Sequence, residues 1–196
     1  MWITFRARAA RTPRLYSAAA AHHRFPGAPV ITYTSVLIAI LAGIVHAGLA
    51  PVVQVAGVYP DLLLVAVVLV TAVFGFTQGL IWAFVAGLTA NLLVAAPLGS
   101  LPLAMLLVSA VVTGGGLLLG RLVWVYPVIA TLAASILADV IALLVSQLVG
   151  DPINLTDVLD LILPAAVLNA AIAGLLLPFV RLAALRLGAL EERPAW

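Results

Sequence analysis

The chain has 196 residues, of which 65% are hydrophobic and only 8% are charged. A soluble domain of this size could not hide so much apolar surface, so the composition indicates a membrane protein. Lys is absent, and Cys is absent too, which excludes disulfides, thiolate metal sites and thiol nucleophiles. The nine Arg residues lie outside the apolar segments. This position favours a topology signal over nucleic-acid binding.

The first 29 residues differ in kind from the rest, because they carry five Arg and two His and no acid. One interpretation is a mitochondrial transit peptide. The interpretation that we favour is a cytoplasmic tail attracted to anionic lipid. We therefore divide the chain into a basic cytoplasmic segment (1–29), a transmembrane domain (30–180) and a cytoplasmic tail (181–196).

Six apolar segments follow the basic one, and a helix needs about 20 apolar residues to cross the hydrocarbon. The predicted fold is therefore an all-α polytopic membrane protein with six transmembrane helices. The uncharged stretch 62–96 would measure about 52 Å as one helix, so we expect it to fold back at 75–79. The predicted spans are 31–50, 61–74, 78–96, 101–120, 123–149 and 161–180.

The arginines predict the orientation of these spans. With both termini in the cytoplasm, all nine Arg fall on the cytoplasmic side. The opposite orientation would place all of them outside, against the positive-inside rule. We therefore expect an N-in, C-in topology.

Small residues recur at every fourth position from residue 75 to 87, and an amide follows one turn later. This spacing places them on one helix face, and such a stripe in an apolar helix is a surface on which another helix docks. We predict a helix-docking or partner face made of Gly75, Gly79, Ala83, Gly87 and Asn91. The three glycines 114–116 are not followed by Lys, so we expect them to serve close helix packing and not phosphate binding.

Three polar side chains fall between the bilayer midplane and the outer leaflet, namely His46, Asp139 and Asn169. We predict that they form an intramembrane polar cluster. A carboxylate at such depth costs about 2.5–3.5 kcal/mol, so Asp139 should be protonated, paired or hydrated. It can serve as hydrogen-bonding glue between helices or as a substrate or proton site, and the sequence leaves both interpretations open.

Catalytic signatures are missing from the sequence. It has no Gly-x-Ser-x-Gly, no His-Glu-x-x-His and no P-loop, and the predicted loops leave no room for a soluble catalytic domain. We expect no enzyme activity, no metal site and no cofactor.

An ordered series of short motifs lies between residues 60 and 103. The series opens with a Pro-Asp-Leu-Leu-Leu run that begins at Pro60 and Asp61. It continues with spaced glycines and with a Phe-x-x-Gly-Leu-x-x-Asn run that contains Phe84 and Leu88. It ends with the turn residues Leu98 and Gly99. The series resembles the MreD family, the integral membrane subunit of the bacterial rod-shape machinery. The chain departs from that family at Ala83, where Gly is usual, and at Asn91, where the family often has Asp.

The resemblance implies a scaffold in the bacterial cytoplasmic membrane. Its implied partners are an MreC-like bitopic protein and, through it, MreB filaments, the RodA glycosyltransferase and a class-B penicillin-binding protein. The family is similar in fold to the six-helix S components of energy-coupling-factor vitamin transporters, so such a transporter subunit is the alternative. Its docking face would be Ala39, Gly43 and Ala47. A channel or proton-coupled carrier is a third option, which only Asp139 favours.

Overall fold

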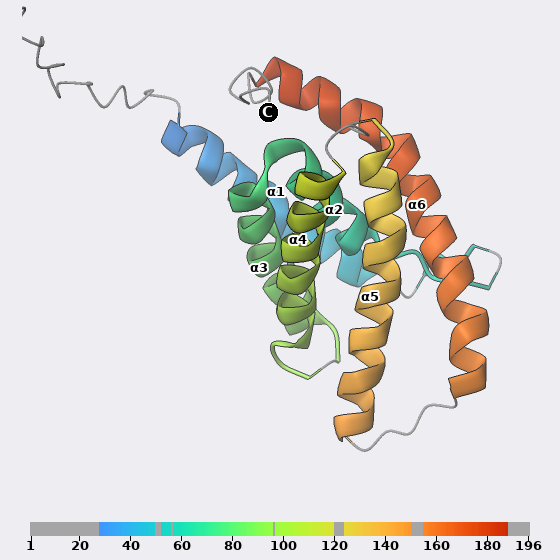
Figure 1. Cartoon of the computed structure of the whole chain (residues 1–196). Helices are drawn as coiled ribbons and strands as arrows, with labels where there is room; N and C mark the ends of the chain where they lie inside the picture. Colours follow the sequence, from blue (N-terminus) through green and yellow to red (C-terminus); the bar gives the residue numbers. More distant parts are fainter. Residues whose placement is uncertain are drawn as a thin grey trace, which may run out of the picture.

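The computed structural model describes residues 28–49, 52–55, 57–95, 97–119, 124–149 and 155–187. This part of the chain is all-helical, apart from one isolated bridge between Val55 and Val58. All six apolar segments are confirmed as helices. They are α1 (Ala28–Leu49), α2 (Leu62–Phe74), α3 (Phe76–Leu93), α4 (Ser100–Leu118), α5 (Tyr126–Val149) and α6 (Leu155–Arg186), which pack as one bundle (Figure 1).

The expectation of six spans is confirmed only in part. Among the described residues, α3, α4, α5 and the Ile162–Arg186 part of α6 are long and apolar enough to cross a membrane. The apolar stretches Tyr33–Leu49 of α1 and Leu62–Phe74 of α2 are shorter. Helix α2 is about 20 Å long at 1.5 Å per residue, whereas the hydrocarbon is about 30 Å thick. One of its ends must therefore lie at membrane depth.

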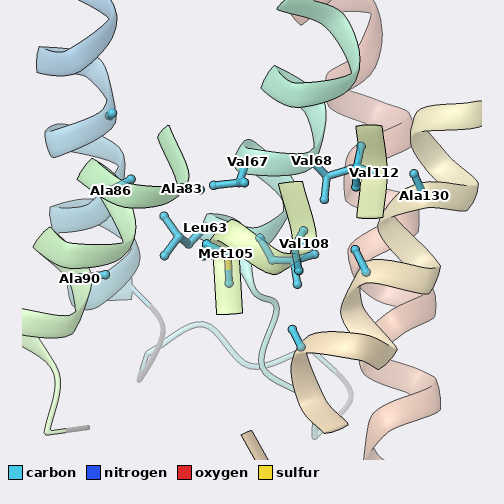
Figure 2. Packing of buried hydrophobic residues seen from close by; sticks show 14 residues of the cluster. Leu63, Val67, Val68, Ala83, Ala86, Ala90, Met105, Val108, Val112 and Ala130 are labelled. Atoms are coloured by element: carbon cyan, nitrogen blue, oxygen red, sulfur yellow. The ribbon is translucent and has the colours of Figure 1, made fainter. Parts of the chain in front are cut away.

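Helix α2 is the centre of the bundle. Nine of its 13 residues are buried, and it contacts each of the other five described helices. Leu63 and Val67 of α2 pack with Met105 and Val108 of α4 in one apolar cluster (Figure 2). A helix that is apolar on every side is one that the protein itself must enclose, and the other helices do so here.

The turn between α2 and α3 is tighter than predicted. We expected a turn over 75–79, but Gly75 alone separates the two helices. Its φ of 96° is a left-handed conformation that glycine adopts without a steric cost. Helix α3 therefore begins at Phe76, and Gly79 already lies in its first turn. Of the predicted small-residue face, only Gly75 lies outside the helix.

Helix α6 is longer than predicted and runs beside α5 (Figure 1). The segment before residue 161 was expected to be a polar loop, but α6 already begins at Leu155. Polar residues exclude a segment from the hydrocarbon, but they do not exclude it from a helix. The C-terminal part of α6 bends across one end of the bundle (Figure 1), and Pro178 accounts for a bend there because it removes a helical hydrogen bond.

The predicted terminal segments overlap the described residues only slightly. Residues 28–29 open α1, and residues 181–186 close α6. The rest of the basic segment and of the tail lies outside the described residues.

Candidate functional site

Side chains from three elements cap the N-terminus of α2. Asp61 is the N-cap residue, and its Oδ1 accepts a hydrogen bond from the Leu64 N–H at 2.9 Å. The Leu63 N–H donates to Nδ1 of His46 on α1 at 3.3 Å. The Asp61 N–H donates to Oδ1 of Asn169 on α6 at 2.8 Å. The first turn of a helix has no partners for its N–H groups within the helix, and these side chains supply them.

Helix α5 completes this cluster. The Asn169 amide donates from Nδ2 to Ser135 Oγ at 2.9 Å, so Asn169 bridges α2 and α5. Asp139 lies one turn after Ser135 and interacts electrostatically with Asp61. Within the described part of the chain, Oδ2 of Asp139 is buried and has no hydrogen-bond partner. We call these five residues the α2-cap cluster: His46, Asp61, Ser135, Asp139 and Asn169.

The predicted intramembrane residues thus gather around a residue that we had assigned to the family motif. His46 and Asn169 both contact the Asp61 region, and Asp139 interacts with its carboxylate. The sequence analysis missed that Asp61 is the centre. A Pro-Asp pair directly before an apolar run is an N-cap signal that could have indicated it.

Asn91 has a local role. Its Oδ1 accepts from the Gly99 N–H at 2.6 Å, and its Nδ2 donates to the Pro97 carbonyl at 3.2 Å. Gly99 has a φ of 89° and is the N-cap residue of α4. The sequence analysis placed this amide on a helix-docking face, but its hydrogen bonds go to the turn between α3 and α4.

The small-residue face of α3 is covered within the chain. A Cβ at Gly79 would lie 2.8 Å from Cβ of Thr71 on α2, and one at Gly87 would lie 2.9 Å from Cα of Pro102 on α4. Ala83 between them is fully buried. The face therefore docks helices of this chain, whereas the motif residue Phe84 points outward and is 52% exposed.

The small-residue face of α1 is covered as well. A Cβ at Gly43 would lie 2.7 Å from the carbonyl oxygen of Ala86 on α3. Ala39 is fully buried, and Ala47 is partly buried. The transporter interpretation needs this face to be free for a coupling module, but α3 occupies it.

Two further polar networks join helices that the sequence did not pair. Trp82 Nε1 donates to Ser35 Oγ at 2.9 Å, and this hydroxyl donates to Gln78 Oε1 at 3.2 Å, which ties α1 to α3. Ser109 Oγ of α4 lies 3.3 Å from Thr71 Oγ1 and 3.4 Å from the Gly79 carbonyl. These networks hold helices together.

Two of the three consecutive glycines have the predicted packing role. Gly115 and Gly116 lie against Tyr126 on α5. A Cβ at Gly115 would lie 3.0 Å from the Tyr126 hydroxyl oxygen, and one at Gly116 would lie 3.5 Å from Cε1 of its ring. The Tyr126 hydroxyl donates to the Val112 carbonyl. Gly114 differs, because it faces open space.

An open groove of about 490 Å³ lies between the α1–α2 loop and α6. All its lining residues are apolar: Val55, Val58, Leu163, Pro164, Val167, Leu168 and Ala171. A vitamin pocket would need several convergent polar groups, which this lining does not supply. Among the described residues, no group of three or more His, Cys, Asp or Glu side chains could hold a metal ion.

Four long apolar helices around a buried central one, with polar groups paired inside the bundle, define a multi-pass membrane protein. The family described as rod shape-determining protein MreD matches residues 24–185. The chain therefore belongs to the MreD family of rod shape-determining membrane proteins, which confirms the resemblance drawn from the motif series. Searches of the curated proteins and of the solved structures found no significant match.

Proposed function

We propose that the protein is a non-enzymatic scaffold of the bacterial elongasome in the cytoplasmic membrane. In this role it binds an MreC-like bitopic protein. Through that protein it links MreB filaments to the synthase formed by RodA and a class-B penicillin-binding protein. The observation that carries the proposal is the family match over residues 24–185.

The geometry of the polar groups supports a structural role. Asn91, Asn169 and Ser109 are buried, and each is hydrogen-bonded within the chain. Their partners are backbone groups and neighbouring helices, which is how membrane helices are held together. The groove has an apolar lining, so it lacks the polar groups that would orient a soluble substrate.

The packing also bears on where a partner binds. The small-residue faces of α1 and α3 are covered by helices of this chain. A partner helix in the membrane therefore has to use an exposed apolar surface, such as the outer face of α4 with Leu107, Val111 and Leu118.

Affinity purification in mild detergent tests the proposal. A tagged chain expressed at its native level should recover a bitopic coiled-coil protein of the MreC type, and an untagged strain should not. Recovery of two ATPase subunits together with a T-type membrane subunit would contradict the scaffold role.

A further inference from the structure

Nδ1 of His46 lies between two partners that require opposite protonation states. It is 3.3 Å from the Leu63 backbone nitrogen and 3.6 Å from Oδ1 of Asp61. To accept the Leu63 N–H, Nδ1 must carry a lone pair, so the imidazole must be neutral. To pair with the Asp61 carboxylate, Nδ1 must carry a proton. The same ring position cannot serve both partners at once.

We propose that His46 is a proton-operated cap on the central helix. In its neutral form His46 caps the Leu63 N–H. When protonated it releases that N–H and forms an ion pair with Asp61. Imidazole is the side chain that ordinarily changes charge between about pH 5 and 8. The device is independent of the scaffold role.

The charged groups around His46 are few. Helices α2 and α3, which pack against α1, contain no titratable side chain in their sequences. The α1–α2 loop contributes Asp61 at its end and the exposed Tyr59. From α5, Asp139 acts on the same site through its interaction with Asp61, and Asn169 of α6 is neutral. Within the described part of the chain, the carboxyl groups near a charged imidazole are therefore those of Asp61 and Asp139.

Protons can reach the ring. The side chain of His46 is 12% exposed and that of Asp61 is 33% exposed. Both residues adjoin the α1–α2 loop, in which Val52 and Tyr59 are exposed.

Protonation would reach the centre of the bundle through Asp61. Oδ1 of Asp61 has two roles: it would form the ion pair with His46, and it accepts the Leu64 N–H. An ion pair to His46 competes with that capping bond while the Leu63 N–H also loses its acceptor. The first turn of α2 would then loosen, and α2 is the helix that contacts each of the other five described helices.

Imidazole NMR in lipid nanodiscs tests the device. The chain has three histidines, so a His22→Gln/His23→Gln background leaves His46 as the only imidazole. Between pH 8 and pH 5.5, the ¹⁵N shift of Nδ1 should change from that of a bare acceptor to that of a protonated donor. Over the same range the exchange protection of the Leu63 amide should fall about two- to tenfold, the equivalent of one hydrogen bond.

Two variants complete the test. His46→Gln keeps an acceptor but cannot titrate, so its Leu63 protection should not change with pH. Asp61→Asn keeps the acceptor for Leu64 but removes the anion, so the His46 protonation midpoint should move to lower pH. The proposal is overturned if Nδ1 stays bare down to pH 5.5, if His46→Gln loses the same protection, or if Asp61→Asn leaves the midpoint unchanged. If His46→Gln fails to fold, the NMR titration of the His22→Gln/His23→Gln chain still shows whether His46 Nδ1 gains a proton and whether the Leu63 amide loses protection.

Discussion

The two buried asparagines use both ends of their amides. Asn91 accepts from the Gly99 N–H and donates to the Pro97 carbonyl. Asn169 accepts from the Asp61 N–H and donates to Ser135. A carboxylate could make only the accepting half of each pair. The Asn91 departure from the family pattern therefore keeps the bond that holds the α3–α4 turn and adds a second one.

Asn169→Leu should destabilise the protein, because it leaves the Asp61 N–H without its acceptor. An orphaned buried donor costs about 1–3 kcal/mol. The free energy of unfolding in mixed detergent micelles measures the change. Gln147→Leu on α5 is the control, because Gln147 is exposed and its replacement should change the free energy by less than about 0.5 kcal/mol. Equal effects of the two variants would contradict the bridging role of Asn169.

The sequence predicted that His46, Asp139 and Asn169 come together, but it could not predict most of the partners of the polar residues. Depth follows from the position of a residue along its span, so His46, Asp139 and Asn169 could be placed together. The partner of Asn91 depends on the left-handed conformation of Gly99, which no periodicity reveals. Ser35, Thr71 and Ser109 are single small polar residues in apolar runs, and only the packing of the helices shows that they meet.

At the scale of elements, the helical glycines include two opposite classes. Gly43, Gly79 and Gly87 allow backbones of neighbouring helices to approach so closely that a Cβ would lie within 3.0 Å of another atom. Gly48 and Gly114 are helical glycines with nothing within 4 Å of a Cβ position. Close packing between membrane helices depends on the first class, whereas the second only lowers helix propensity.

Gly79→Ala and Gly87→Ala should each destabilise the bundle, because the added methyl meets Thr71 or the backbone of Pro102. Overpacking of this kind costs about 1–3 kcal/mol. The free energy of unfolding and the yield of monodisperse protein are the measurements.

Gly114→Ala provides the matched control for these two variants. It adds the same methyl group at a helical position that has no atom within 4 Å of the added Cβ. It should leave the stability of the protein unchanged or raise it by up to about 1 kcal/mol. Three variants of equal stability would show that the packing around α3 is looser than described.

Hydropathy predicts that a segment is a helix, but it does not predict how the helix is used. The α2 segment was expected to be a short span, but nine of its 13 residues are buried among the other helices. Lipid and a protein interior are equally apolar, so the same Leu and Val composition serves both. The start of α6 was missed for a related reason, because a helix can continue into water where hydropathy indicates a loop.

At the scale of the whole molecule, the ends of the helices alternate between two sides of the bundle. Ser35 near the start of α1 bonds Trp82 of α3. At the same side, the Arg181 guanidinium near the end of α6 lies 4.1 Å from the ring centroid of Trp124, just before α5. The turn at Gly75 belongs to this side, and the turn at 97–99 lies at the opposite one (Figure 1). In the sequence, all nine arginines come before α1, between α4 and α5, or within and after the last turns of α6.

The positive-inside rule then predicts which side faces the cytoplasm, and cysteine labelling can test it. The chain has no native cysteine, so any labelling of this protein comes from the single thiol that is introduced. Leu98 is 81% exposed in the α3–α4 turn, and Thr77 is exposed next to Gly75. In spheroplasts, a membrane-impermeant maleimide should label Leu98→Cys at once, but it should label Thr77→Cys only after lysis. The reverse pattern would show that the bundle is inverted and that its arginines face outward. Labelling of both thiols before lysis would show that α3, which separates them, does not cross the membrane, although it is one of the four helices long enough to do so.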